Sequence, residues 1–458
     1  MPAPRFAHII TEWKTLARLG GPILVAQMSQ MANGAIDTIM AGRYSAQDLA
    51  GVAIANSFWL PLFLFFLGTL NALQPVIARH HGSGHVARVW PTFQQGVWIA
   101  LLSSVLMITA LLHVAPLLAW LRVDAVTAGI THGYLAGFVW GIPAMLLLGA
   151  LRGLTDGLGH TRIMMVASLL SNVVNLPLNY LFIYGAAEGT PWAMEAMGGA
   201  GCGWATSWAN WVACLAVCLY LYWRPLTGSV PNASASSWRV NKELFSLLKL
   251  GLPIGGTLFF EVGMFTVIAL LLAPLGPVVV AGHQLVLNVV SLVFMVPLSL
   301  GMALTLRVSY LIGAGTPQHA QVLARSALLL ALGIAAINIP LLVFGRHAIA
   351  ALYTHDPAVQ TIATQLLRLA ALFQLADVLQ VTAISALRGY HDTRVAMLII
   401  LLSFWGIGIP IGYTLTYTDI WTPAMGAAGF WTGLIAALAC ACVLLLWRLL
   451  RFQLKAAH

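Results

Sequence analysis

The chain has 458 residues, of which 60% are hydrophobic and 8% are charged, whereas about 25% of the residues are charged in an ordinary soluble domain. This composition excludes a soluble globular protein and predicts an all-α integral membrane protein, because strands of alternating polarity are absent. The formal net charge of +9 comes from basic residues scattered over short loops, which is typical of membrane topology and not of a nucleic-acid surface.

Apolar runs separated by short polar loops predict twelve transmembrane helices. Their approximate limits are 16–41, 49–72, 92–113, 126–148, 163–185, 201–223, 245–272, 280–304, 320–345, 358–386, 395–418 and 424–447. With the N-terminus inside, only Arg43, Arg122, Arg346 and Arg368 of the 22 Lys and Arg residues lie outside, and the other 18 lie inside. Because positive residues collect on the cytoplasmic side, we expect both termini to be cytoplasmic.

The chain also repeats itself at a nearly constant offset. Five short motifs of the first half return in the same order in the second half, 228 to 236 residues later. They are Leu19-Gly20-x-Pro22-Ile23 with Leu250-Gly251-x-Pro253-Ile254, Ala50-Gly51 with Ala281-Gly282, Gly82-Ser83-Gly84 with Gly313-Ala314-Gly315, Ala150-Leu151-Arg152-Gly153 with Ala386-Leu387-Arg388-Gly389, and Met197-Gly198-x-Ala200-Gly201 with Met425-Gly426-x-Ala428-Gly429.

Each repeat contains six predicted spans, so both halves enter the membrane from the same side. We therefore expect two six-helix bundles related by pseudo-two-fold symmetry along the membrane normal, as in parallel-repeat transporters. The predicted N-lobe is 1–223 and the predicted C-lobe is 245–458, joined by a polar cytoplasmic linker at 224–244. By analogy, two such bundles favour transport by alternating access.

The first predicted span carries a carboxylate. Gln30, Asn33 and Asp37 lie at i, i+3 and i+7, and therefore close to one face of a helix. A charged side chain inside the bilayer costs roughly 2.5–3.5 kcal/mol on insertion scales and marks an ion, proton or cation-substrate site by default. The structural alternative is a polar contact that joins two helices.

The fifth predicted span offers partners for this carboxylate. Asn172, Asn175 and Asn179 share the same spacing, and Pro177 frees a backbone carbonyl by interrupting the helix. A carboxylate with amide and carbonyl oxygens suits Na⁺, so we expect Asp37 to bind Na⁺ or a proton there. The alternative role of the asparagines is hydrogen bonding between helices.

Only two further acidic residues are predicted to lie well inside spans, Glu261 and Asp377, both in the second half. Burial and a second nearby carboxylate both favour the protonated form of an acid, so the pair is expected to carry protons. Phenylalanines surround Glu261, and Phe373 precedes Asp377 by one turn, which also suits a lipophilic cation. The alternative is a permanently neutral pair that is hydrogen-bonded to the backbone.

Other polar clusters are predicted to be structural. The stretches 152–156 and 388–392 each begin with Arg-Gly and end with Asp, and we expect them to be paired inner-loop clamps that set the topology and lock helices together. A solvated basic loop is expected around His80, His81 and His85, which have no acidic or cysteine residue adjacent to them. The sequence shows no nucleophile constellation, cofactor fingerprint or ATPase motif, so we expect no enzyme activity and no cofactor, and an ion gradient as the energy source.

These features together resemble a known family. Twelve spans in two repeats, the stretch LGGPILVAQMSQMANGAIDTIMAG at 19–42, the ALRG motifs, the seventh-span glutamate and the tenth-span aspartate are similar to multidrug and toxic compound extrusion (MATE) transporters, in particular their bacterial NorM branch. The resemblance covers nearly the whole chain. It implies export of cationic, amphipathic drugs in exchange for Na⁺ or H⁺, in the bacterial inner membrane, by a monomer in contact with lipid.

The resemblance also implies roles for single residues. Asp37, Asn175 and Asn179 would form the N-lobe cation or proton site, and Glu261 and Asp377 the C-lobe acidic pair. Gln284 and Asp356 would match positions implicated in drug contact, and Asp37 would share in it, although Asp356 followed by proline is also typical of a helix N-cap. A tyrosine accompanies the C-lobe acids in a sodium-coupled member, and Phe373 replaces it here, which removes an oxygen ligand for Na⁺.

Two other functions are compatible with a polytopic membrane protein. A lipid-linked oligosaccharide flippase of the same two-bundle plan is expected to line its cleft with basic residues for pyrophosphate, whereas the predicted buried charges here are acidic. A receptor or membrane-embedded enzyme is expected to show a catalytic constellation or a sizeable extramembrane domain. We therefore expect a cation-coupled multidrug antiporter.

Overall fold

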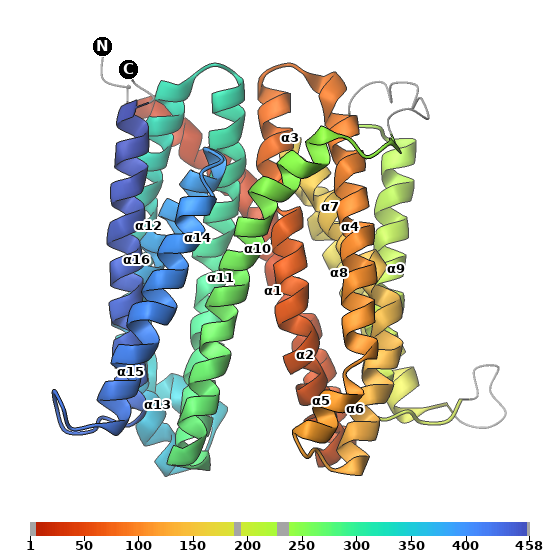
Figure 1. The fold of residues 1–458 in the computed structure, drawn as a ribbon, viewed down its shortest axis with the longest axis vertical. Coiled ribbons are helices and arrows are strands. Elements are labelled where there is room, and N and C mark those ends of the chain that lie inside the picture. The colour runs from red at the N-terminus through yellow and green to blue at the C-terminus, as the bar shows by residue number, and fades with distance from the viewer. Residues whose placement is uncertain (1–5, 187–193, 227–237, 456–458) are drawn as a thin grey trace. The chain divides into compact units, whose positions relative to one another are not determined.

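The computed structural model describes residues 6–186, 194–226 and 238–455, and these residues are folded almost entirely into helices (Figure 1). Within this part of the chain the only strand-like feature is an isolated bridge between Ala186 and Met194. The α-helices are α1 (Phe6–Tyr44), α2 (Ala46–Leu70), α3 (Leu73–Gly82), α4 (Val89–Leu112), α5 (Ala115–Trp120), α6 (Ala125–Phe138), α7 (Ile142–Gly157), α8 (Thr161–Tyr184), α9 (Ala200–Trp223), α10 (Lys242–Leu272), α11 (Pro277–Gly313), α12 (Pro317–Tyr353), α13 (Pro357–Gly389), α14 (Arg394–Leu401), α15 (Ile409–Tyr417) and α16 (Ala427–Lys455).

The helices have the length and the apolarity of membrane spans. Eleven helical segments in the described part of the chain are long and apolar enough to cross a bilayer. The first helix, α1, is not among these eleven segments. It has 39 residues and contains the first predicted span, and polar residues such as Gln30, Asn33 and Asp37 make this span less apolar than the others. The prediction of an all-α protein with about twelve spanning helices is therefore confirmed.

The chain divides into two compact units whose borders lie inside helices. The N-terminal unit is Val25–Gly255, and the C-terminal unit is Met1–Leu24 together with Gly256–His458. Each unit therefore contains most of one sequence repeat and the beginning of the first helix of the other repeat. The predicted linker 224–244 falls largely on residues 227–237, which lie outside the described residues.

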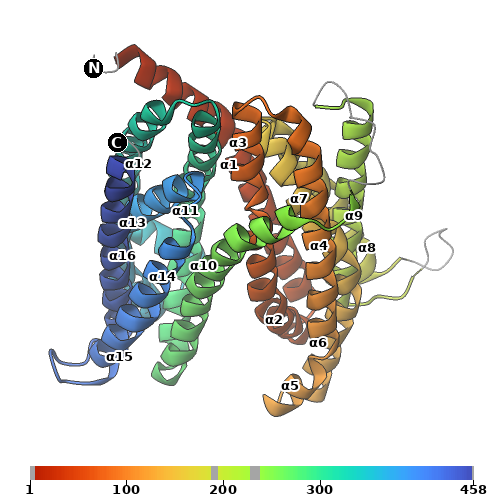
Figure 2. The ribbon, with the colours of Figure 1, turned by 45° about the horizontal axis from the view of Figure 1, so that its top comes forward.

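Each unit is built around a buried helix. In the C-terminal unit, α13 packs against α11, α12 and α16, and the two views in Figures 1 and 2 both show these helices side by side. In the N-terminal unit, α7 packs against α3, α4 and α9, and α8 packs against α9. The buried positions of α7 include Leu146, Ala150 and Leu154 at helical spacing.

The sequence repeats adopt the same local backbone conformation. Gly84 and its counterpart Gly315 have φ angles of 74° and 73°, and Gly198 and its counterpart Gly426 have φ angles of 59° and 57°. Positive φ angles favour glycine because it has no Cβ atom. The repeated glycines therefore mark matching turns in the two repeats.

The ALRG motifs serve close helix packing. A Cβ atom on Gly153 of α7 would lie 2.5 Å from the Cβ atom of Leu73 on α3, and one on Gly389 of α13 would lie 2.8 Å from that of Val308 on α11. Such distances are far below van der Waals contact. The glycine of each motif thus lets the buried helix of its unit approach the neighbouring helix.

Two aspartates at matching positions cap helices. Asp124 accepts a hydrogen bond from the backbone N–H of Thr127 at the start of α6 (3.0 Å), and Asp356 accepts one from Ala358 at the start of α13 (2.9 Å). The backbone hydrogen bond from Thr127 holds the pKa of Asp124 below its usual value, because it stabilises the carboxylate. The predicted cap at Asp356 is confirmed.

Candidate functional site

The carboxylate of Asp37 lies buried in the N-terminal unit and receives hydrogen bonds from two side chains. Its side chain on α1 is 6% exposed. Asn179 on α8 donates from Nδ2 to Oδ1 (2.6 Å), and Thr206 on α9 donates from Oγ1 to Oδ2 (3.0 Å). Three helices therefore hold this carboxylate in one position.

Asn175 completes the network around Asp37. Its Oδ1 accepts a hydrogen bond from Asn179 Nδ2 (2.7 Å), and its Nδ2 donates to Thr206 Oγ1 (3.3 Å). Asn175 and Asn179 are both fully buried and lie one turn apart on α8, so they present their amides to the same side. Asp37, Asn175, Asn179 and Thr206 therefore form a closed ring of polar groups in an apolar surrounding.

This ring offers two kinds of chemistry. A proton can bind directly to Asp37, because the carboxylate is the only charged member of the ring. A small cation needs oxygen ligands, and in the observed arrangement both asparagine amides point N–H groups at their partners. Asn179 Oδ1 is buried without a hydrogen-bond partner, so a half-turn of the Asn179 amide replaces an N–H donor with an oxygen ligand.

The third asparagine of α8 has a different role. Asn172 Nδ2 donates to the backbone oxygen and to the hydroxyl of Ser29 on α1, both at 2.8 Å, and thus joins two helices instead of contacting Asp37. The sequence reasoning also missed Thr206. A threonine in an apolar helix gives no charge or spacing signal, so only the packing of α8 against α9 identifies it.

The acidic pair in the C-terminal unit has unequal partners. Gln380 on α13 donates from Nε2 to Glu261 Oε1 on α10 (3.1 Å), and the guanidinium of Arg388 interacts electrostatically with Glu261. Asp377 interacts electrostatically with Glu261, but its Oδ2 is buried without a partner. Neither Gln380 nor Arg388 was predicted to take part in this pair.

Phe373 packs into an aromatic cluster of the C-terminal unit. Its ring lies 5.9 Å from that of Trp431 on α16 in an edge-to-face arrangement, and Trp431 Nε1 donates to Nδ1 of the buried His283 on α11 (3.2 Å). Gln284, the predicted drug-contact residue next to His283, is exposed. Asp356 is likewise exposed, at the start of α13.

The predicted clamps join helices, as expected, but the first of them does not lie in a loop, because Arg152 and Asp156 are part of the buried helix α7. Arg152 and Asp156 belong to α7 and are 7% and 2% exposed. Arg152 Nη1 donates to Gln27 Oε1 on α1 (3.2 Å). The acidic residue that follows the second motif, Asp392, pairs with Arg448 of α16 (2.7 Å). Asp156 is therefore a further buried carboxylate, and it adds to the three that were predicted.

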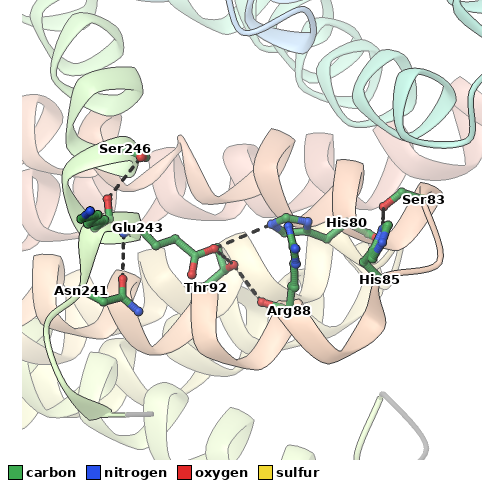
Figure 3. Close-up of polar contacts among 9 residues, drawn as sticks. His80, Ser83, His85, Arg88, Thr92, Asn241, Glu243 and Ser246 are labelled. Carbon is green, nitrogen blue, oxygen red and sulfur yellow. Dashed lines mark hydrogen bonds and ion pairs between the residues drawn. The ribbon is translucent and has the colours of Figure 1, made fainter. Parts of the chain in front are cut away.

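The predicted solvated histidine loop also needs correction. Figure 3 shows that His80 lies on a helix and faces Glu243 at the start of α10, with the His80 Nε2 and Glu243 Oε1 atoms 3.8 Å apart. Thr92 donates to the same Glu243 oxygen (2.5 Å). An acidic residue distant in the sequence therefore reaches His80. Among the described residues, no group of three or more His, Cys, Asp or Glu side chains is arranged to hold a metal ion.

Known proteins resemble the chain over nearly its full length. It is 43% identical to the "Probable multidrug resistance protein NorM" of Shewanella oneidensis, over 97% of this chain and 96% of that protein. It is 42% identical to the "Multidrug resistance protein PmpM" of Pseudomonas aeruginosa, over 98% of this chain and 94% of that protein.

Solved structures confirm the two-bundle fold. The chain superposes on the Vibrio cholerae MATE transporter VcmN in its bent form with a TM-score of 0.82 at 19% identity, covering 98% of both chains. It also superposes on a multidrug resistance MATE family transporter in an outward-facing conformation, with a TM-score of 0.86 at 16% identity and complete coverage of both chains. The MatE family model matches residues 22–181 and again residues 253–414, once in each repeat. The chain therefore belongs to the MatE family of multi-pass membrane transporters and is not an enzyme.

Proposed function

We propose that this transporter is a cation-coupled multidrug efflux antiporter that exports cationic, amphipathic drugs and dyes in exchange for Na⁺ or H⁺. Two relatives are more than 40% identical to this chain over nearly their whole length. Both are named as multidrug resistance proteins, one of them as a probable one. The observation that carries the ion coupling is Asp37, a buried carboxylate held by donors from two other helices. An intramembrane carboxylate of this kind marks an ion or proton pathway by default.

The proposed mechanism uses competition for acidic sites. The cation or proton enters from outside and neutralises Asp37 and the acidic pair of Glu261 and Asp377, and drug, attracted by the same negative charges, is displaced outward. One elementary charge that moves across 100 mV supplies about 2.3 kcal/mol, which corresponds to roughly 50-fold accumulation. No bound cofactor is needed for such a cycle.

Gln284 and Asp356 are proposed to contact the drug, because both side chains are exposed and available to a ligand. The protein is further proposed to act as a monomer in the bacterial inner membrane with both termini in the cytoplasm. A C-terminal fluorescent-protein fusion that fluoresces, together with an inactive C-terminal alkaline phosphatase fusion, would support this orientation. The reverse result would refute it.

The function is tested by dye efflux from proteoliposomes under a Na⁺ gradient and, separately, under a pH gradient. We expect efflux under at least one gradient in the wild type and its loss in the Asp37→Asn and Asp377→Asn double variant. Asn179→Ala is expected to reduce efflux, whereas the matched control Asn172→Ala, which removes an amide that does not contact Asp37, is expected to retain it. Absence of efflux under both gradients would refute the antiporter.

A further inference from the structure

A short segment at the start of α10, residues 238–243, is fastened to α4 of the N-terminal unit along its length. We call this segment the strap. Its later residues contact the earlier turns of α4, so the strap runs antiparallel to that helix. Its contacts are hydrogen bonds from Trp98 Nε1 to the carbonyl oxygen of Trp238 (2.8 Å), from Gln95 Nε2 to that of Arg239 (3.1 Å) and from Thr92 Oγ1 to Glu243 Oε1 (2.5 Å). Figure 3 shows the last of these bonds beside His80.

The strap lies level with the end of a complete membrane span. The helix α2 has 25 residues and is therefore about 38 Å long, enough to cross a hydrocarbon core of roughly 30 Å. It ends at Leu70, and Leu73, directly after it, lies against Gly96 of α4. Gly96 is next to Gln95, which holds the strap. The strap therefore lies where the apolar part of the unit meets the lipid headgroups.

The exposed side chains of this region combine apolar and basic groups. Trp238 and Val240 are 41% and 56% exposed, and Phe245, in the first turn of α10, is 67% exposed. Arg239 and Lys242 are exposed as well. Aromatic rings are enriched at the interface between membrane and water, and basic side chains can lay their apolar stems along such a surface while their charged ends reach the headgroups. This combination is typical of a segment that lies in the headgroup region.

The two positive charges of the strap have no acidic partner in the described part of the chain. Neither Arg239 nor Lys242 forms an ion pair there. Glu243, the only acid of the strap, already binds Thr92 and lies 3.8 Å from His80. The preceding residues 227–237 contain no Asp or Glu. Arg239 and Lys242 are therefore available to an anionic partner outside the chain.

We propose that the strap binds the headgroup of an anionic phospholipid such as phosphatidylglycerol, with Arg239 and Lys242 at its phosphate. The exposed rings of Trp238 and Phe245 offer apolar contact to its acyl chains. A phospholipid fits this surface better than a soluble anion, because the charges lie at the end of a membrane span beside exposed aromatic rings. Basic residues at this depth attract anionic lipids, and the bound lipid adds a fastening for the start of α10.

Tryptophan quenching by brominated lipids tests the proposal on full-length protein in bilayers. The chain has 16 tryptophans, so the signal of Trp238 is taken as the difference between each protein and its Trp238→Phe derivative. We expect brominated phosphatidylglycerol to compete for this position about fivefold or more better than brominated phosphatidylcholine. Arg239→Gln combined with Lys242→Gln should bring this ratio close to one, whereas Arg239→Lys combined with Lys242→Arg, which keeps both charges, should retain it.

The matched control is Arg122→Gln, because Arg122 is exposed in the same unit but lies beyond the far end of α4, and it should leave the ratio unchanged. Equal quenching by the two brominated lipids in the wild type would overturn the proposal. A preference that survives in the Gln double variant, or that falls equally in Arg122→Gln, would also overturn it, because the preference would then not depend on the strap. Soluble poly-glutamate has acidic groups without acyl chains and should not compete at about 0.15 M ionic strength; competition would identify a soluble acidic partner and overturn the lipid.

Discussion

The ion pair between Glu12 on α1 and Arg307 on α11 is expected to be a main stabilising contact of the C-terminal unit. Arg307 donates from Nε to Glu12 Oε2 (2.8 Å) and from Nη2 to Glu12 Oε1 (2.7 Å), so the pairing is bidentate. The guanidinium also lies over the ring of Tyr310, 5.1 Å from its centroid. The side chains of Arg307 and Glu12 are 24% and 10% exposed, so solvent screens this pair only in part.

The magnitude follows from these exposures. Exposed ion pairs contribute about 0–1 kcal/mol, and breaking a buried pair costs about 3–5 kcal/mol. A half-buried bidentate pair lies between these limits, so Arg307→Ala is expected to lower the free energy of unfolding by about 2 kcal/mol. At about 2–4 °C per kcal/mol for a folding unit of roughly 200 residues, the apparent unfolding temperature should fall by about 4–8 °C.

Thermal unfolding of the detergent-solubilised protein checks this value through its tryptophan fluorescence. Arg451→Ala is the matched control, because Arg451 is exposed and its guanidinium lies over the ring of Trp447 on its own helix, and it should shift the transition by less than about 1 °C. The charge-swapped double variant Glu12→Arg with Arg307→Glu should recover most of the loss. A shift for Arg307→Ala no larger than that of Arg451→Ala, or double-mutant energies that are simply additive, would refute the reasoning.

Three further predictions concern single contacts. Thr206→Val removes the hydroxyl that donates to Asp37 Oδ2 and should reduce dye efflux by about tenfold. Thr206→Ser keeps the hydroxyl and should retain efflux. Equal efflux by the two variants would exclude a role for the hydroxyl. Burial raises the pKa of the Tyr390 hydroxyl to about 12. The folded state therefore keeps the hydroxyl proton at pH values where the unfolded chain loses it, and the free energy of unfolding should fall between about pH 10 and pH 12. In pH-dependent unfolding, Tyr390→Phe should lose less stability than the wild type over this interval. Gly389→Ala places a Cβ atom 2.8 Å from side-chain atoms of Val308 and should lower the free energy of unfolding by about 1–3 kcal/mol. The control Gly333→Ala has open space around the new Cβ atom and should be neutral or stabilising in the same unfolding assay.

Most residues of the network around Asp37 can be predicted from the sequence, because charged and amide side chains are rare in apolar helices. Asp37, Asn175 and Asn179 follow helical spacing, and a carboxylate in such a setting requires partners. Thr206 cannot be predicted in this way, because a hydroxyl in an apolar helix usually donates to the backbone of its own helix, as that of Thr382 does. Which of the three asparagines of α8 faces Asp37 depends on helix rotation, and only the packing of α1 against α8 determines that Asn172 bonds to Ser29 instead.

The prediction failed where polar residues continue a helix beyond its apolar part. Asp156 follows an Arg-Gly pair and precedes Gly157 and Gly159, which together resemble a loop, yet α7 continues to Gly157. Its burial comes from packing against α3, where Ile77 lies against Gly157. Glu243 and His80 are 163 positions apart in the sequence, and no local pattern links them. Helix ends and long-range polar pairs of this kind depend on tertiary packing, which local sequence patterns do not contain.

The repeated Leu-Gly-x-Pro-Ile motif acquires a physical meaning from the division of the chain. The border between the compact units lies between Leu24 and Val25 in α1 and between Gly255 and Gly256 in α10, two positions that are separated by the same 231 residues as the motifs. Each border follows a proline, Pro22 or Pro253, that lies inside its helix and removes a backbone hydrogen bond there. The chain passes from one unit to the other only at these two places. In both repeats the motif therefore places a proline, which cannot donate a backbone hydrogen bond within its helix, directly before the point where the chain leaves one compact unit and enters the other.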